Sequence, residues 1–205
     1  MADKKGKRVK SAKKDVADQL IKAAFARARA HGWRQLTLYQ LSQDTGLSMS
    51  EILAAFPTKG MLLKGYVQRV DHRAWDDYEA GEDDSTRDRI FDLMMCRFDE
   101  LNEDKPAIAA IAKQACTDPE TLCVSGCGLR RSMHAVLEKA DVRVSGIRGM
   151  LRVQALGLIF LATFRTWLQD TSEDMSKTMA ELDKHLARAE SFEQDFGGAA
   201  RKAAA

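Results

Sequence analysis

Residues 37–59 carry the pattern that most constrains the fold of this 205-residue chain. Two short runs with apolar residues at helical spacing flank Gly46, and Pro57 closes the second run. Thr37 and Ser48 stand where side-chain caps of helix N-termini are favoured, and Gly46 permits a tight turn without the steric cost of a Cβ atom. The segment therefore predicts two short helices joined by a turn, which is either a helix-turn-helix or an ordinary helical hairpin.

The segments on either side extend this helical pattern. Upstream, apolar residues recur every three or four positions and stop at Gly32, which predicts an amphipathic helix that braces the hairpin. Its apolar positions are Val16, Leu20, Ile21, Ala24, Phe25 and Ala28. Downstream, Thr58 can cap a longer helix. The apolar positions of that helix are Met61, Leu62, Leu63, Tyr66, Val67, Val70 and Trp75.

This arrangement resembles the tetracycline-repressor (TetR) family of bacterial transcription regulators over roughly the first third of the chain. The resemblance rests on Ile21, Ala23, Ala24, Phe25, Gly32, Thr37, Leu41, Thr45, Gly46, Leu47, Ser48, Ile52, Phe56, Pro57, Thr58, Lys59, Leu62 and Leu63, which keep the family's spacing without an insertion. It implies an all-α homodimer in which a three-helix, helix-turn-helix domain for double-stranded DNA precedes a helical effector-binding and dimerisation bundle. A repressor relieved by a small apolar effector molecule is the function that it implies.

The second short helix supplies candidate contacts to base edges, although it departs from the family pattern. Ser48, Ser50 and Glu51 can form hydrogen bonds with bases, and Met49 or Ala54 can touch a thymine methyl group. Phosphate contacts are expected from residues at or near helix N-termini. These are Thr37, Tyr39, Gln40 and Lys59. The family usually has a tyrosine and then a histidine or aromatic residue where this chain has Leu53, Ala54 and Ala55. Residues 48–56 also contain no basic residue, so specific recognition by this helix alone is expected to be weak.

Charge is divided unevenly along the chain. Residues 1–75 carry 15 Lys and Arg against 6 Asp and Glu, whereas residues 76–205 carry 17 against 24. Most of the basic excess lies in residues 1–14, which we expect to be disordered until they meet an anion. This tail is either an arm that follows the DNA backbone or a solubilising tail or leader.

The rest of the chain predicts a helical domain over 61–196, after a helix-turn-helix domain over 15–60 and before a disordered tail over 197–205. Capping signals at Ser85 and Asp88 open one helix, and Pro106 and Pro119 begin two more. A long helix is expected over 145–170, and residues 171–174 are expected to cap the last one.

The long helix is apolar nearly all round from Val153 to Phe164, so it must be buried on every side. This favours a homodimer built on a four-helix bundle over a monomer with this helix at its centre. The run is too short to span a bilayer, and no secretory signal precedes it. We therefore expect a cytoplasmic protein without membrane insertion.

The C-terminal part has a second resemblance, to the accessory proteins of coenzyme Q biosynthesis, which share the TetR-like fold and bind isoprenoid lipids. It rests on residues 148–153, 167–174 and 178–183. This implies an alternative function as a lipid- or quinone-pathway protein whose helix-turn-helix does not bind specific DNA.

Soft and aromatic side chains of the second domain are candidates for an effector pocket, with ordinary core packing as the alternative. They are Phe91, Met94, Met95, Phe98, Met133, Phe160 and Phe164.

Catalysis and cofactor binding find little support. No histidine stands beside a nucleophile, and there is no glycine-rich phosphate loop. Cys116, Cys123, Cys127 and His134 could hold a metal or form a redox pair, but no CxxC motif is present, so we expect reduced, buried thiols and no metal.

Overall fold

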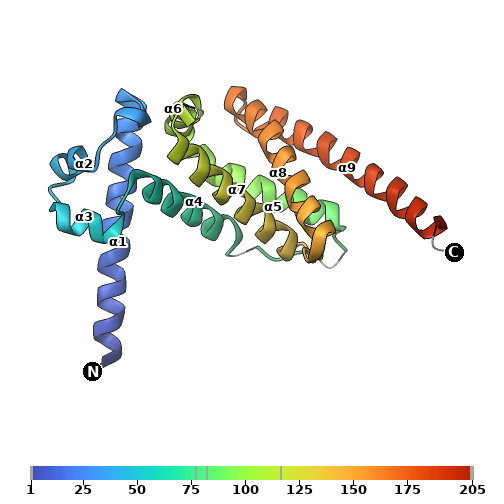
Figure 1. Ribbon diagram of the computed structural model, residues 1–205, viewed down its shortest axis with the longest axis horizontal. Coiled ribbons are helices and arrows are strands. Elements are labelled where there is room, and N and C mark those ends of the chain that lie inside the picture. Colours follow the sequence, from blue (N-terminus) through green and yellow to red (C-terminus); the bar gives the residue numbers. More distant parts are fainter. Residues whose placement is uncertain (1, 77, 82, 116, 204–205) are drawn as a thin grey trace. The chain divides into compact units, whose positions relative to one another are not determined.

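The computed structural model describes residues 2–76, 78–81, 83–115 and 117–203, with side chains within 15–192. These described residues form nine α-helices and one 3-10 turn and contain no strand (Figure 1), which confirms the all-α prediction. In chain order the elements are α1 (Ala2–His31), η1 (Trp33–Gln35), α2 (Leu38–Thr45), α3 (Met49–Ala55), α4 (Lys59–Trp75), α5 (Thr86–Asn102), α6 (Lys105–Ala115), α7 (Pro119–Lys139), α8 (Gly146–Gln169) and α9 (Ser176–Ala203).

The chain forms two compact units, and each unit combines separate parts of the sequence. Unit 1 consists of Met1–Asp71 and Leu101–Gly128, and unit 2 consists of His72–Glu100 and Leu129–Ala205. The divisions between the units therefore fall inside α4, α5 and α7, whereas the sequence predicted a single boundary between 15–60 and 61–196.

Helix α1 is the centre of unit 1. The predicted apolar face is buried, with Leu20 and Ala24 fully enclosed, and the helix ends before Gly32, whose φ of +85° favours glycine. The helix also begins earlier than expected, because Ala2 is its first residue and residues 2–14 continue it instead of forming a disordered tail. Lysine, arginine and alanine are strong helix formers, and adding turns to an existing helix costs less than starting one. Helix α9 likewise continues through the predicted tail to Ala203.

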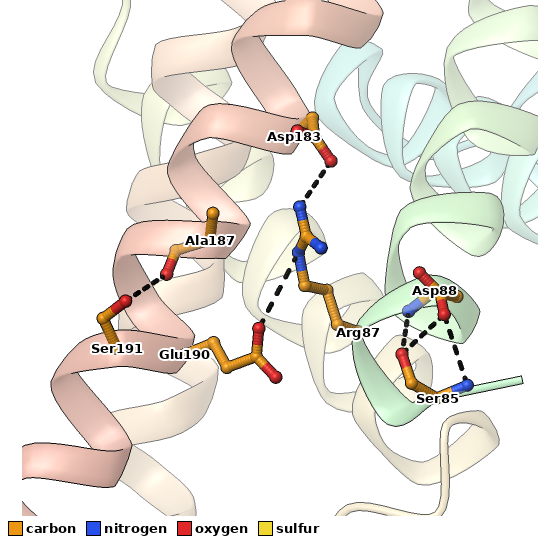
Figure 2. Close-up of polar contacts among 7 residues, drawn as sticks. All are labelled: Ser85, Arg87, Asp88, Asp183, Ala187, Glu190 and Ser191. Carbon is orange, nitrogen blue, oxygen red and sulfur yellow. Dashed lines mark hydrogen bonds and ion pairs between the residues drawn. The ribbon is translucent and has the colours of Figure 1, made fainter.

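Unit 2 packs α5, the second half of α7, α8 and α9 around an aromatic core. The Trp75 indole donates a hydrogen bond to the carbonyl of Leu93, 2.9 Å away, and Lys139 donates to the carbonyl of Trp75 at 2.7 Å. Arg87 of α5 lies between two carboxylates of α9 in Figure 2, with Nη2 2.5 Å from Asp183 Oδ1 and Nε 4.0 Å from Glu190 Oε2. These ion pairs fix the beginning of α5 against α9.

Helix α8 has two apolar stripes, and only one of them is covered within the chain. Its buried stripe is Gly149, Val153, Leu156, Phe160, Thr163 and Trp167. The other stripe, Ile147, Leu151, Leu158 and Leu161 with the adjacent Met150, is half exposed or more, and Ile147 reaches 75%. Within the single chain the helix is therefore covered on one side only, and the rest of the cover that its apolar composition calls for has to come from outside the chain.

The length and composition of α8 would also let it cross a membrane, and it is the one helix among the described residues that meets this test. A core helix of a soluble protein meets the same test. Apolar length alone does not distinguish lipid from protein as the layer that covers a helix.

The start of α9 is capped by two carboxylates. The helix begins at Ser176, after Met175 with a φ of +53°, and Asp174 Oδ1 accepts a hydrogen bond from the Ser176 N–H at 3.1 Å, as expected of a cap within 171–174. Asp170 also reaches forward, and its Oδ2 accepts hydrogen bonds from the backbone N–H and the hydroxyl of Thr178 at 2.9 and 2.7 Å. Eight residues separate the two, so no local spacing rule predicts this cap.

Candidate nucleic-acid interface

Helix α2 and the turn after it form as the sequence predicts. The Thr37 hydroxyl accepts a hydrogen bond from the Gln40 N–H at 3.3 Å, and the Gln40 side chain accepts one from the Thr37 N–H at 3.1 Å. Gly46 ends the helix in the left-handed region with a φ of 70°. The Ser42 hydroxyl then donates to the carbonyl of Leu47 at 2.6 Å, which closes the turn between the two helices. The turn is thus held by its own side chains.

Helix α3 presents one buried residue inward and a continuous exposed face outward. The Ser48 hydroxyl accepts from the Glu51 N–H, and the Glu51 carboxylate accepts from the Ser48 N–H at 2.9 Å, which is a second capping box. Ile52 is fully buried and anchors the helix to unit 1. The outward residues Ser48, Met49, Ser50, Glu51, Leu53 and Ala54 are all exposed. The structure therefore brings all five predicted base-contacting residues together on one accessible surface.

The four residues predicted to contact phosphates differ in whether their side chains are free to do so. Tyr39 is 64% exposed and its ring is accessible. Thr37 and Gln40 already use their side chains in the capping box. The ammonium of Lys59 lies 2.7 Å from Asp118 Oδ2, in an ion pair that leaves the lysine side chain only 20% exposed. Lys59 therefore serves the packing of unit 1, whereas Tyr39 is accessible and makes no capping bond of this kind.

Electrostatics at α3 favour neither DNA phosphates nor guanine. The hydrogen bonds from the Ser48 hydroxyl and N–H lower the pKa of Glu51, so this carboxyl is ionised at neutral pH. No basic residue lies on α3. On the neighbouring elements Arg27 pairs with Asp44, which raises the pKa of the guanidinium and lowers that of the carboxyl. If α3 contacts bases, those contacts therefore have to be made by its hydroxyl and apolar groups.

The start of α7 supports the helix-turn-helix through side chains that sequence analysis did not identify. Asp118 caps α7, pairs with Lys59 and accepts a hydrogen bond from the Thr121 hydroxyl at 3.0 Å. The buried Thr121 hydroxyl in turn accepts from the Trp33 indole at 2.9 Å. The pKa of Asp118 is lowered, first by its hydrogen bond with Lys59. The sequence Asp118-Pro119 signals a helix start, but nothing in it names partners 59 and 88 residues away.

Helix α6 adds a further contact of this kind. The backbone N–H of Arg34 donates to the Gln114 side-chain oxygen at 2.7 Å. The same amide lies against Gly32, where a Cβ atom would come within 2.4 Å of Gln114 Nε2. The turn between α1 and α2 is thus fixed by a side chain from α6.

The residues predicted to line an effector pocket lie in the core of unit 2. Met94, Met95, Phe98, Met133 and Phe160 are buried, while Phe91 and Phe164 are partly exposed. The Phe98 and Phe160 rings stack with centroids 5.1 Å apart, and the Arg97 guanidinium lies 4.6 Å from the Phe160 centroid. Phe98, Phe160 and Phe164 therefore form one aromatic cluster with a buried cation beside it, and the three methionines are buried in the same unit.

The cysteines differ from the expectation of buried thiols. Cys123 and Cys127 are exposed on α7, Cys96 is half-buried, and Cys116 lies outside the described residues. His134 is exposed. Within the described part of the chain, no group of three or more His, Cys, Asp and Glu side chains is placed to hold a metal ion.

Comparison with known proteins gives structural likeness alone. No protein-family model matches the sequence, and no curated protein matches it. Solved structures do resemble it, and three of these are TetR transcriptional regulators. The one from Nitrosomonas europaea is 23% identical with a TM-score of 0.68 and covers 84% of this chain and 97% of that chain.

The other two are more distant in sequence. The Rhodococcus structure is 12% identical with a TM-score of 0.59 and covers 85% of this chain and 95% of that one. The Streptomyces coelicolor structure is 17% identical with a TM-score of 0.60 and covers 92% and 88%. The chain therefore has the fold of these proteins, in which a helix-turn-helix domain is joined to a helical C-terminal part.

Proposed function

We propose that this chain is a cytoplasmic transcriptional regulator that binds double-stranded DNA as a homodimer, with α3 in the major groove. The observation that carries the proposal is the outward face of α3, which is exposed along its whole length while Ile52 anchors the opposite face. The fold shared with TetR regulators supports this use of the helix. An α-helix of this kind fits the major groove, where base pairs differ in their hydrogen-bonding edges.

The proposed contacts divide into two classes. Ser50 and Ser48 form hydrogen bonds with the edges of DNA bases, and Met49 and Ala54 contact thymine methyl groups. These are the contacts available because α3 offers hydroxyl and apolar groups and no basic residue. Tyr39 contacts the phosphate backbone, because its side chain is 64% exposed and is not engaged in the capping box of Thr37 and Gln40. Basic residues 1–14 add a sequence-independent, salt-dependent share of the affinity.

The exposed stripe of α8 supports the homodimer. Ile147, Leu151, Leu158 and Leu161 follow one another at steps of four, seven and three positions, which puts them along one stripe of the helix. A second copy of α8 and α9 covers this exposed stripe if the two helix pairs form a four-helix bundle about a two-fold axis. Two copies of α3 can then read two half-sites of one operator.

We further propose that a small apolar effector molecule relieves repression. The ligand would enter the cluster of aromatic and thioether side chains in unit 2 and would have to bind one arrangement of the dimer better than the other. Differential affinity of this kind changes the separation of the two recognition helices and releases DNA. The proposed function is binding without bond chemistry, so it includes no enzymatic activity.

The test is binding to DNA from around the chain's own gene, measured against random duplex across a salt series. We expect discrimination that persists at physiological salt, because base contacts depend less on counterion release than phosphate contacts do. Ser50→Ala should weaken binding to the operator by about 1–3 kcal/mol and relax its specificity, whereas Tyr39→Phe should weaken all sequences alike. Ser191→Ala, an exposed serine on α9, is the matched control.

Deleting residues 1–14 separates the two sources of affinity. The shortened protein should bind more weakly and with a smaller salt slope, yet still prefer the operator. Affinity that disappears entirely with the tail, at any sequence, would contradict recognition through α3.

A lipid- or quinone-pathway accessory protein is the second candidate. Two observations favour it: α3 carries no basic residue, and α8 exposes a long apolar stripe. Under this alternative the same salt series gives only weak, tail-dependent association without sequence preference.

A further inference from the structure

Two exposed thiols lie one helical turn apart in the first half of α7. Cys123 and Cys127 are both exposed, and their four-residue spacing in α7 puts their Cβ atoms about 5–6 Å apart on the same side of the helix. The surface around them is open, because no atom lies within 4 Å of where a Cβ atom of Gly126 would stand. Leu122 beside them is also 53% exposed. The pair is therefore accessible to a reagent from solution.

This spacing suits a bridging atom better than a direct disulfide. A disulfide needs Cβ atoms about 3.5–4.5 Å apart, which two residues at this spacing in a regular helix do not reach. One thiophilic centre bonded to both sulfurs, each at about 2.3 Å as for zinc thiolates, spans a longer gap. Soft thiolate ligands also select soft centres over hard cations.

We propose that Cys123 and Cys127 form a two-thiol binding site for a single thiophilic centre of the trivalent arsenic type. With an organic arsenous oxide, the arsenic–oxygen bond is replaced by two arsenic–sulfur bonds. The two thiol protons and the oxygen leave together as one water molecule. Arsenic stays trivalent and both sulfurs keep their oxidation state, so the step needs no oxidant or reductant.

The position of the thiols connects the site to the helix-turn-helix within unit 1. Cys123 follows two residues after Thr121, whose hydroxyl holds the Trp33 indole, and Asp118 of the same turn holds Lys59 at the start of α4. A bridge from residue 123 to residue 127 closes a turn of α7 directly after these contacts. Occupancy should stabilise the part of α7 on which α4 and η1 rest.

The test uses phenylarsine oxide on the full chain, with mass spectrometry and a count of free thiols. We expect one phenylarsenic group per chain and the loss of two reactive thiols. Cys123→Ser or Cys127→Ser should lower the affinity at least about tenfold, since a single thiol gives no chelate. Cys96→Ser and Cys116→Ser should leave it unchanged. Tight binding that survives Cys123→Ser, or that is lost in Cys116→Ser, overturns the assignment.

A register test separates geometry from simple thiol number. In the Cys127→Ser background, Gly126→Cys puts the second thiol three residues from Cys123 and should restore chelation, because residues three apart share a helix face. Ser125→Cys puts it two residues away, on another side of the helix, and should not restore it. Equal rescue by both variants would refute a site defined by the helix face.

Stability and DNA binding give separate readouts. Saturating reagent should raise the Tm of the wild type and leave that of Cys123→Ser unshifted, because only the chelating form gains from binding. Any change in operator affinity on arsenical binding rests on the proposed regulatory function. Failure of operator binding would sink that function, while the stoichiometry and the Tm shift would still decide the thiol site.

Discussion

Among the glycines that the structure describes, Gly149 has the least room for a side chain. The first turn of α8 passes over the backbone of Val144, and an ideal Cβ atom at residue 149 would lie 2.0 Å from the Val144 carbonyl carbon and oxygen. Backbone cannot move aside as a flexible side chain can. Helix propensity alone favours alanine here, so the two effects have opposite signs and the clash is the larger.

Gly149→Ala should therefore lower the free energy of unfolding by about 1–3 kcal/mol. Gly126→Ala is the control, since the open helical position in α7 should gain up to about 1 kcal/mol from propensity. Urea unfolding followed by circular dichroism measures both. A stabilised Gly149→Ala variant would show that the approach of the two backbones is not close.

Asp170 gives a residue-scale prediction about pH. Burial tends to raise the pKa of this carboxyl, but hydrogen bonds from Ser172 and Thr178 outweigh it and hold the pKa well below its ordinary value. The folded-state pKa is depressed, so the stabilisation is fully present above the unfolded value of about 3.9 and is lost as the pH falls toward the folded value.

Asp170→Asn should cost about 1 kcal/mol at pH 7, and its stability should fall less than that of the wild type between pH 5 and pH 2. Unfolding free energies at several pH values test this. Asp174→Asn, an exposed carboxylate that accepts one bond from the Ser176 N–H at 3.1 Å, should change the pH profile less. Parallel profiles for wild type and Asp170→Asn would contradict the role of the ionised cap.

At the level of elements, helix starts were predictable wherever the cap is local. The boxes of Thr37 with Gln40, Ser48 with Glu51 and Ser85 with Asp88 each close within three residues, so the sequence contains both partners of every bond. The Ser85 box is visible in Figure 2. Local propensity and capping rules apply at this range.

Elements held by distant partners were not predictable. The cap of α9 spans eight residues and crosses a left-handed Met175, and the support of the helix-turn-helix comes from Asp118, Thr121 and Gln114. The face of α3 followed from spacing, whereas the pairing of Lys59 with Asp118 did not, because spacing reports which side a residue lies on and not what stands opposite.

At the scale of the whole molecule, the proposed homodimer depends on the exposed apolar stripe of α8. Burying a leucine side chain contributes about 1.5–3 kcal/mol, and a two-fold contact buries each residue of the stripe twice. Hydropathy predicted that this helix needs cover from a second copy, but it does not say which residues of the helix the chain itself leaves uncovered. The structure locates the uncovered residues, Leu158 among them at 68% exposure.

Leu158→Glu should convert a dimer into monomers, since each two-fold contact would bring charge into an apolar surface from both sides. Sedimentation equilibrium or light scattering measures the change. Leu122→Glu, an exposed leucine of α7, should leave the mass unaltered. A wild-type protein that is already monomeric at micromolar concentration would remove the basis for two half-sites.

The division of unit 1 between Met1–Asp71 and Leu101–Gly128 limits how this protein can be rearranged by gene fusion. A chimaera that borrows only the first 76 residues would leave behind Asp118, Thr121 and Gln114, and with them the acceptor of the Trp33 indole and the counter-ion of Lys59. The N-terminal third is consequently not an exchangeable cassette. A graft onto another bundle has to carry α6 and the opening turns of α7 along with it.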